Sequence, residues 1–213
     1  SFISVTPVGD VTINGAGTCR IKVSQAANSS FQSGVAYFDV IINKANPLIN
    51  TTNLVKTCGD TDFTLTATSS STGSFIYTSL DPLVVSITGG DTATMNASGV
   101  AVIEVTLAED ANYNSATATF TVTVSKGNST PTISDETRNY GDADFTLTTT
   151  TSSTGNIVYT VSDTSIATVS GSTVHIEGAG STTIFVTLLE DDCYNAGTTS
   201  MTLTVNSVSQ TVT

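Results

Sequence analysis

Tryptophan is absent from this sequence, histidine occurs once, and Lys and Arg together number only six among 213 residues. A single histidine leaves no set of side chains from which a nucleophilic triad or a zinc site could be assembled. His175 stands between Val174 and Ile176, so strand alternation places it outward, where we expect a solvated side chain. Two carboxylates could serve a glycosidase, but nothing in the sequence marks a cleft. We therefore expect no enzyme.

Basic residues are too few to balance the acidic ones. Eighteen Asp and Glu residues face six Lys and Arg residues, which gives a formal net charge of −12. Such a field repels phosphate backbones and anionic membrane surfaces, so nucleic acid is not an expected partner, whereas a divalent cation is a compatible one. Long apolar runs are also missing, since a membrane span needs about 18 consecutive apolar residues. Membrane insertion is not expected.

The residues that dominate instead are Thr and Ser, set among Val, Ile, Leu, Ala and Phe. They alternate, so that Ile184, Val186 and Leu188 share one strand face while Thr and Ser fill the other. No window shows helical periodicity, and β-branched residues favour strands. The pattern predicts an all-β chain built from antiparallel sandwiches, in which each sheet has one buried and one solvated face.

An internal repeat organises the chain. Gly-Asp-x-Asp-Phe-Thr-Leu occurs at residues 59–65 and again 82 residues later, at 141–147. Alignment on this motif defines a first copy at 1–45, a second copy at 46–127 and a third copy at 128–207, with 208–213 expected to be a linker into a further copy. The third copy predicts seven short strands in about 80 residues, at 132–134, 145–148, 157–161, 166–169, 174–176, 182–189 and 201–205.

The first copy lacks its opening half. Residues 2–5 align with the fourth predicted strand, residues 11–13 with the fifth and residues 38–42 with the last. Half a sandwich leaves one apolar face against water, which a small domain does not tolerate. Two explanations are open: the 213 residues are cut from a longer chain, or another chain supplies the missing strands.

Several motifs together carry a family resemblance. Besides the repeated Gly-Asp-x-Asp-Phe-Thr-Leu, they are Ser-Thr-Gly at 71–73 and 153–155, Ile-Ala-Thr-Val-Ser at 166–170, Gly-Ala-Gly-Ser-Thr-Thr-Ile at 178–184 and Asp-Ala-Asn-Tyr-Asn at 110–114. They resemble bacterial immunoglobulin-like (Big/MBG-type) tandem repeats, which are strung along giant secreted adhesins of Bacteroidetes, including the gliding-motility adhesin type. The sequence departs from the repeat at Cys58, where the third copy has Tyr140, and at Cys193, where the second copy has Asn112.

This resemblance implies immunoglobulin-like modules in a head-to-tail array, an extracellular position on the cell surface and a stalk or adhesive role, without catalytic residues. The partners it implies are neighbouring modules of the same chain, together with surface polysaccharide or other cell-surface proteins. Two alternatives remain open. One is an immunoglobulin-like appendage of a virus or phage, or a subunit of an extracellular filament. The other is an accessory carbohydrate-binding module of a secreted enzyme.

The acidic turns suggest a cation site between copies. In an immunoglobulin-like module the first turn faces the next module and the last hairpin loop faces the previous one. Stacking of the second and third copies would then bring Asp60 and Asp62 toward Glu190, Asp191 and Asp192. Such an oxygen-rich group suits Ca²⁺, which takes six to eight oxygen ligands and would stiffen the array. The alternative is that Asp60 and Asp62 stabilise their own turn through side-chain-to-backbone hydrogen bonds.

The three cysteines cannot all pair with one another, and no copy contains two of them. Cys19 lies in phase with Ile21 and Val23, so we expect a buried free thiol. Cys58 and Cys193 each stand at a turn that faces the same junction in a head-to-tail array. We therefore predict a Cys58–Cys193 disulfide between the second and third copies, which would fit an oxidising, extracellular setting.

One modification site is also expected if the source is a Bacteroidetes cell. Asp-Thr-Ala at residues 91–93 resembles the O-glycan acceptor of that group. The candidate acceptor is Thr92, in what the sequence suggests is an exposed turn.

Overall fold

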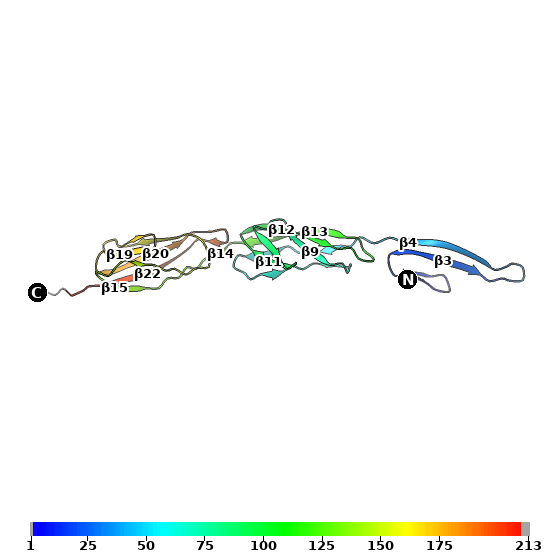
Figure 1. The fold of residues 1–213 in the computed structure, drawn as a ribbon, viewed down its shortest axis with the longest axis horizontal. Helices are drawn as coiled ribbons and strands as arrows, with labels where there is room; N and C mark the ends of the chain where they lie inside the picture. The colour runs from blue at the N-terminus through cyan, green and yellow to red at the C-terminus, as the bar shows by residue number, and fades with distance from the viewer. Residues whose placement is uncertain (1, 210–213) are drawn as a thin grey trace.

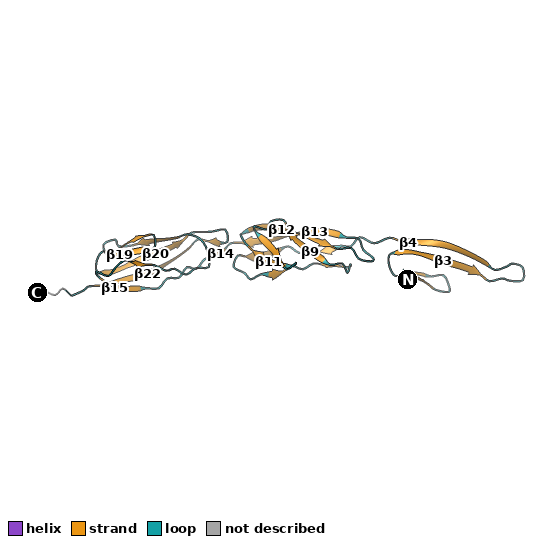
Figure 2. Ribbon diagram, viewed as in Figure 1, coloured by secondary structure: helices purple, strands orange, loops and turns teal. Residues whose placement is uncertain are grey.

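The computed structural model describes residues 2–209, which form a long row of β-sheets with the first copy at one end and the third copy at the other (Figure 1). Every regular element in this part of the chain is a strand (Figure 2). None of the described residues belongs to a helix that could cross a membrane. The predicted all-β class is confirmed, whereas the linker expected at 208–213 falls outside the described residues from 210 onward.

The second copy is an immunoglobulin-like sandwich of two sheets. The larger sheet has the order β6 (Leu54–Thr57), β13 (Ala116–Ser125), β12 (Gly99–Leu107) and β9 (Phe75–Ser79), and the smaller has the order β10 (Val85–Thr88), β11 (Thr92–Met95) and β7 (Phe63–Thr64). A two-stranded pair of β5 (Ile49–Asn50) and β8 (Thr68–Ser69) lies beside them. All of these pairs are antiparallel except β6 with β13, which is parallel.

The third copy repeats this architecture. Its larger sheet has the order β15 (Glu136–Asn139), β22 (Gly197–Asn206), β20 (Gly180–Leu188) and β17 (Ile157–Val161), and its smaller sheet has the order β16 (Phe145–Thr146), β19 (Thr173–Ile176) and β18 (Ala167–Ser170). As in the second copy, the first strand of the larger sheet pairs in parallel with the last, here β15 with β22.

The core follows the predicted alternation. On β12, Ile103 and Val105 are fully buried, and on β20 the same is true of Ile184 and Val186. The residues between them, Glu104 and Phe185, face away from the core, since successive side chains of a strand face opposite sides of the sheet, and Phe185 is 48% exposed. Each pair of sheets thereby encloses an apolar layer, and the strength of this burial, about 25 cal/mol for each Å² removed from water, holds the sandwich closed.

Sequence reasoning missed the edge strands β6 and β15, and the strand predicted at 132–134 is reduced to one bridge between Thr132 and Thr150. Glu136–Asn139 contains no apolar residue, so no alternation marks it. Its inward basic side chain packs on an aromatic ring instead: Arg138 Cζ lies 4.6 Å from the Phe145 centroid. Lys56 Nζ lies 4.5 Å from the Phe63 centroid in the same place of the second copy.

The first copy consists of two hairpins, β1 (Ile3–Val5) with β2 (Val11–Ile13) and β3 (Gly17–Gln25) with β4 (Gly34–Ile42). No opposing opening half covers them within the described residues, and the consequence is visible at matched positions. Phe38 is 50% exposed, whereas its counterpart Phe120 is 4% exposed. The expectation of a buried thiol at Cys19 is wrong for the same reason, because Cys19 is free but only half-buried.

Candidate functional site

The features that distinguish this chain from isolated sandwiches lie where one copy meets the next. We call the contact of residues 44–46 and the first copy with residues 109–114 the first junction. The second junction is the contact of residues 126–128 and the second copy with residues 190–195. In both, the linker that leaves one copy pairs with the last hairpin loop of the following copy, through an isolated bridge at the first junction and a two-stranded sheet at the second, so neither linker is a free chain.

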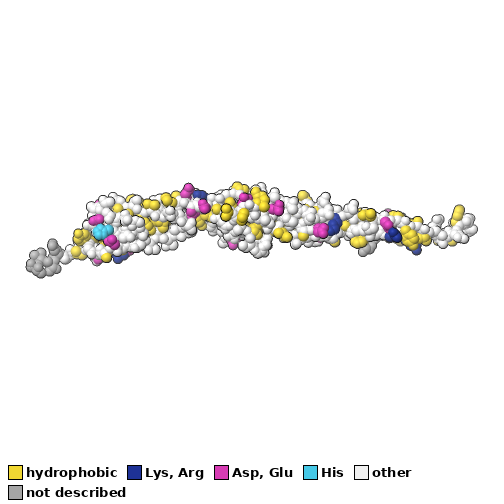
Figure 3. All heavy atoms as spheres, turned by 45° about the horizontal axis from the view of Figure 1, so that its top comes forward, with side chains coloured by type: hydrophobic (Ala, Val, Ile, Leu, Met, Phe, Trp, Pro, Cys, Tyr) yellow, Lys and Arg dark blue, Asp and Glu magenta, His cyan; other side chains and the backbone are white. Residues whose placement is uncertain are grey.

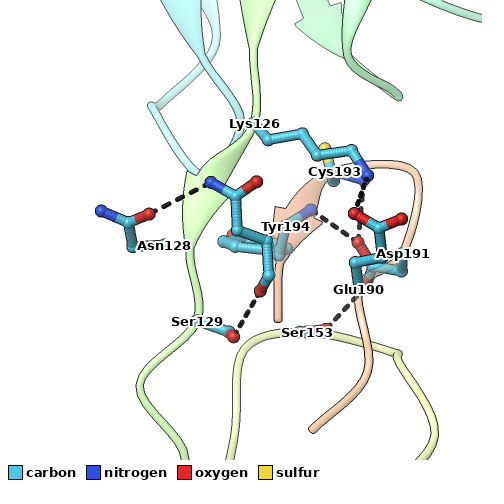
Figure 4. A network of polar contacts seen from close by, with 9 residues as sticks. Lys126, Asn128, Ser129, Ser153, Glu190, Asp191, Cys193 and Tyr194 are labelled. Atoms are coloured by element: carbon cyan, nitrogen blue, oxygen red, sulfur yellow. Dashed lines mark hydrogen bonds and ion pairs between the residues drawn. The ribbon is translucent and has the colours of Figure 1, made fainter. Parts of the chain in front are cut away.

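At the second junction the linker strand β14 (Gly127–Asn128) pairs in parallel with β21 (Tyr194–Asn195). The Gly127 N–H donates to the Cys193 carbonyl at 2.9 Å. Figure 4 shows this region from close by, with Lys126 reaching Glu190 and the side chains of Asn128 and Ser129 contacting the loop. The Lys126 Nζ to Glu190 Oε2 distance is 3.1 Å.

The first junction uses the same arrangement, with its linker 82 residues and its loop 81 residues earlier in the chain. Ala45 forms a parallel bridge with Tyr113, its N–H donates to the Asn112 carbonyl at 2.9 Å, and its carbonyl accepts from the Asn114 N–H at 2.9 Å. Lys44 Nζ lies 3.2 Å from Glu109 Oε2. The space-filling view shows basic side chains beside acidic ones at intervals along the rod (Figure 3). Sequence reasoning missed both ion pairs, although Lys44 and Lys126 recur at the repeat spacing.

One carboxylate holds each receiving loop in shape. In the third copy this is Asp191, whose Oδ2 accepts from the Ser153 hydroxyl at 2.8 Å and from the Thr154 N–H at 2.8 Å. Its Oδ1 accepts from the N–H groups of Cys193 at 2.8 Å and Tyr194 at 2.6 Å. The same carboxylate therefore ties the last hairpin loop to the Ser-Thr-Gly turn that precedes β17.

Asp110 repeats this role in the second copy, accepting from Ser71, Thr72, Asn112 and Tyr113 at 2.7–2.9 Å. Hydrogen bonds from the N–H groups of Asn112 and Thr72 favour the charged form and hold the pKa of Asp110 well below its usual range. Burial raises the pKa of Asp191, but hydrogen bonds from Ser153 and three N–H groups outweigh it, and this pKa is also well below normal. Both carboxylates are thus ionised anchors.

The Ser-Thr-Gly motif is explained by this contact. A Cβ placed on Gly155 would stand 1.9 Å from the Leu189 carbonyl oxygen, and one on Gly73 would stand 1.9 Å from that of Ala108. No side chain fits such a distance, so glycine is required at both positions. The motif combines a hydroxyl that donates to the anchor carboxylate with a residue that lets the two turns approach.

A disulfide joins the second and third copies across the second junction. Cys58 and Cys193 are bonded, with their Cα atoms 5.4 Å apart. Cys58 is buried, and Cys193 packs against the core of the second copy. The pairing predicted from the sequence is therefore present. It also shows that the turn after β6 and the last hairpin loop of the third copy face each other, as head-to-tail stacking requires.

Close packing surrounds the disulfide. A Cβ on Gly127 would stand 2.6 Å from the Cys58 carbonyl oxygen and 3.0 Å from the Tyr194 ring. A Cβ on Gly59, which has φ +92°, would stand 2.7 Å from the Tyr194 hydroxyl. The two glycines let Tyr194 of the third copy fit against the end of the second.

The five carboxylates expected around one Ca²⁺ are not gathered into one group. Within residues 2–209, no three His, Cys, Asp or Glu side chains lie together as a metal site would require. Asp191 is engaged as the loop anchor and Glu190 pairs with Lys126. Asp60 Oδ2 accepts from the Thr57 N–H at 2.9 Å, which is the turn-stabilising role weighed as the alternative. The side chains of Asp62 and Asp192 are exposed.

Two other sequence expectations need correction. His175 is exposed, but it is not merely solvated, because its Nδ1 lies 2.6 Å from Asp144 Oδ1. The hydrogen bond that His175 donates to Asp144 and the negative charge of Asp144 raise the pKa of His175. Thr92 does not lie in an exposed turn, since it is the half-buried first residue of β11 and pairs with Thr88 and Thr64. Glycosylation of Thr92 stays a prediction.

No protein-family model matches the chain, and no curated protein matches it. Among solved structures, domains 4 and 5 of the S-layer protein SbsC are similar at 23% identity and a TM-score of 0.33, covering 67% of this chain and 82% of that one. Drosophila N-cadherin EC1-3 is similar at 15% identity and a TM-score of 0.33, covering 97% and 86%. A SusE-like surface located polysaccharide binding protein from Bacteroides thetaiotaomicron is similar at 14% identity and a TM-score of 0.30, covering 96% and 41%. Likeness at this level does not identify a function.

Proposed function

We propose that this chain is a spacer segment of a cell-surface stalk or adhesin, in which the junctions keep successive sandwich modules in a stiff line. The observation that carries the proposal is that both linkers are paired with the loop of the following copy. Residues 44–46 and 126–128 each contribute backbone hydrogen bonds and an ion pair to that loop. A linker held in this way cannot act as the free hinge that joins most neighbouring domains.

In this proposal the modules and the junctions between them have different mechanical roles. The module boundaries are those of the repeat, at 46–127 and 128–207, and each module contributes length. The junctions set the stiffness, because each anchor carboxylate fixes the loop that receives the linker. An array of such units behaves as a nearly one-dimensional rod whose properties add from unit to neighbouring unit.

The extracellular location rests on the disulfide, because a bond such as Cys58–Cys193 persists in oxidising compartments. The assignment to giant Bacteroidetes adhesins of the gliding-motility type rests on the repeat motifs alone. Adhesion by such a segment would be the sum of weak contacts made by many copies with surface polysaccharide or other surface proteins.

Solution scattering tests the stiffness. We expect small-angle X-ray scattering of the protein to give one extended shape whose length matches the row of sheets in Figure 1. The control is a variant in which residues 44–46 and 126–128 are both replaced by Gly-Ser-Gly, together with Cys58→Ser and Cys193→Ser. This variant should show a broad distribution of bent shapes. If the unaltered protein bends as much as the variant, the proposal is wrong.

A further inference from the structure

The place of the disulfide in the chain decides which residues bear load when the rod is pulled from its two ends. Tension that enters at the N-terminal side runs along the backbone to Cys58. From there the S–S bond leads directly to Cys193 and on toward the C-terminus. We propose that Cys58–Cys193 is a mechanical bypass that keeps residues 59–192 out of the load path. The inference rests on the proposed function, because a stalk is the kind of protein that is pulled.

The bypassed segment contains most of two sandwiches. In the second copy it includes β7 to β13, and in the third copy it includes every strand from β14 to β20. Within the second and third copies the loaded strands that remain are few: β5 and β6 on one side of the disulfide, and β21 and β22 on the other. The core strands β12 and β20, which carry the fully buried Ile103 and Ile184, lie inside the shielded loop.

The two main loaded strands are well placed to transmit tension. β6 pairs in parallel with β13 over four residues, and β22 pairs with β20 over nine residues and with β15 over four. The four residues of β6 lead directly to Cys58, and the ten residues of β22 continue from the loop that holds Cys193 to Asn206. Because both are already extended strands, their detachment would add little length to the molecule.

The bypass limits how far the rod can lengthen. Cys58 and Cys193 are separated by 135 residues in the sequence but by 5.4 Å between Cα atoms. At about 3.4 Å for each extended residue, the shielded loop holds back about 460 Å of chain. Without the bond, unfolding of the second and third copies would release this length. With the bond, the two copies act as one inextensible unit.

The first junction has no such bond, because Asn112 stands at the position of Cys193. Its Oδ1 accepts from the Ala16 N–H at 2.9 Å, which is a contact that tension can break. Tyr140 stands at the position of Cys58 in the third copy, so that turn also offers no thiol to a following copy. The inextensible unit is therefore confined to the second and third copies.

Single-molecule stretching tests the bypass. Handles are attached through peptide tags at the two termini, so that no cysteine is used, and the fully unfolded length is measured. We expect the unaltered protein to be shorter than the Cys58→Ser/Cys193→Ser variant by about 460 Å. This comparison does not require the variant to fold, because the measured quantity is the contour length of the fully unfolded chain. Cys19→Ser, which removes the thiol outside the loop, should stretch like the unaltered protein.

Each alternative outcome overturns the inference. Equal lengths would mean that no bypass exists. A deficit of about 130 Å or about 590 Å would mean that Cys19 is paired with Cys58 or with Cys193 instead, given sequence separations of 39 and 174 residues. Because the instrument supplies the pull, these outcomes leave the stiffness of the junctions, and so the proposed function, to be judged by scattering.

Discussion

The two junctions differ in one bond and agree in almost everything else. In both, the linker pairs with the loop of the following copy, and a Lys Nζ of the linker lies 3.1–3.2 Å from a Glu Oε2 of that loop. An ionised Asp accepts hydrogen bonds that hold each loop in shape. Only the second junction adds a disulfide, between Cys58 and Cys193. Its linker also has Gly127 where the first junction has Ala45.

This difference teaches that alignment of the copies and their covalent locking are separate properties. Alignment comes from backbone pairing, which tolerates a change of side chain, and so it recurs in every copy that keeps the linker and loop. Locking needs two cysteines within about 7 Å between Cα atoms and space for the chains that carry them. Gly127 provides that space, because a Cβ there would meet the Cys58 carbonyl oxygen at 2.6 Å.

Removing the Cys58–Cys193 disulfide should have the largest effect on stability, because it leaves the second junction with only the noncovalent contacts that the first junction also has. We expect Cys58→Ser/Cys193→Ser to lower the free energy of unfolding of the second and third copies by about 2–4 kcal/mol, because the unfolded chain regains the freedom of a long loop. Urea unfolding measures this loss, with Cys19→Ser as the matched control. An unchanged unfolding midpoint in the double variant would show that the bond does not stabilise the pair.

The anchor carboxylates are common to both junctions, so Asp110→Asn and Asp191→Asn should weaken the two receiving loops alike. Each replaces an acceptor of several hydrogen bonds by an amide that can satisfy only part of them. We expect a lower melting temperature at pH 7 for either variant. Asp192→Asn, which alters an exposed side chain in the same loop, should leave the melting temperature unchanged.

The same carboxylates predict a dependence on pH. Because their pKa values are lowered in the folded protein, their stabilisation is complete above the ordinary Asp pKa of about 3.9 and is lost as the pH falls below it. The melting-temperature difference between the unaltered protein and the Asn variants should therefore shrink on going from pH 7 to pH 3. A difference that stays constant over this range would refute the anchor role.

Gly127→Ala should affect only the second junction. The added methyl group must displace the Cys58 carbonyl or the Tyr194 ring, at a cost of about 1–3 kcal/mol. The matched change is Ala45→Gly, which adds no atoms and should cost at most about 1 kcal/mol through backbone entropy. Chemical denaturation of both variants compares them. Equal losses at the two sites would mean that the close packing around the disulfide is not specific to the second junction.

The ion pairs should give the smallest effect. The Lys44–Glu109 and Lys126–Glu190 pairs reach solvent, so Lys44→Ala and Lys126→Ala should each cost about 0.2–1 kcal/mol, and less in high salt. Lys22→Ala serves as the control, because Lys22 forms none of the ion pairs found in the described part of the chain. Losses that are the same at low and high salt would point to lost packing instead of lost charge attraction.

Local patterns identified most of the core strands. Alternation marked β20 and β13 because one face of each lies in the core, and burial of one face favours apolar side chains at every second position. The edge strand β15 has no such face, since its inward positions carry Glu136 and Arg138. β15 pairs with β22, which lies more than 60 residues further along the chain, so a pattern in the local sequence cannot predict this pairing.

The candidate site was predictable only in part. The disulfide follows from two turns that carry cysteine in one copy each, once the copies are placed head to tail. The calcium arrangement does not follow in the same way, because the number of acids near a junction says nothing about where their side chains point. Asp191 accepts hydrogen bonds from four residues of its own copy, and Glu190 pairs with Lys126.

The sequence by itself determined the repeat, the all-β class and the apolar face of each strand, because these depend on spacing along the chain and on the transfer of side chains out of water. Tertiary structure alone decided which polar groups meet. A carboxylate placed between two loops can accept from a backbone N–H, pair with a lysine or bind a cation, and the choice depends on distances of a few tenths of an ångström. Those distances exist only after Asp191 and Ser153, or Cys58 and Cys193, have been brought together by the packed sheets.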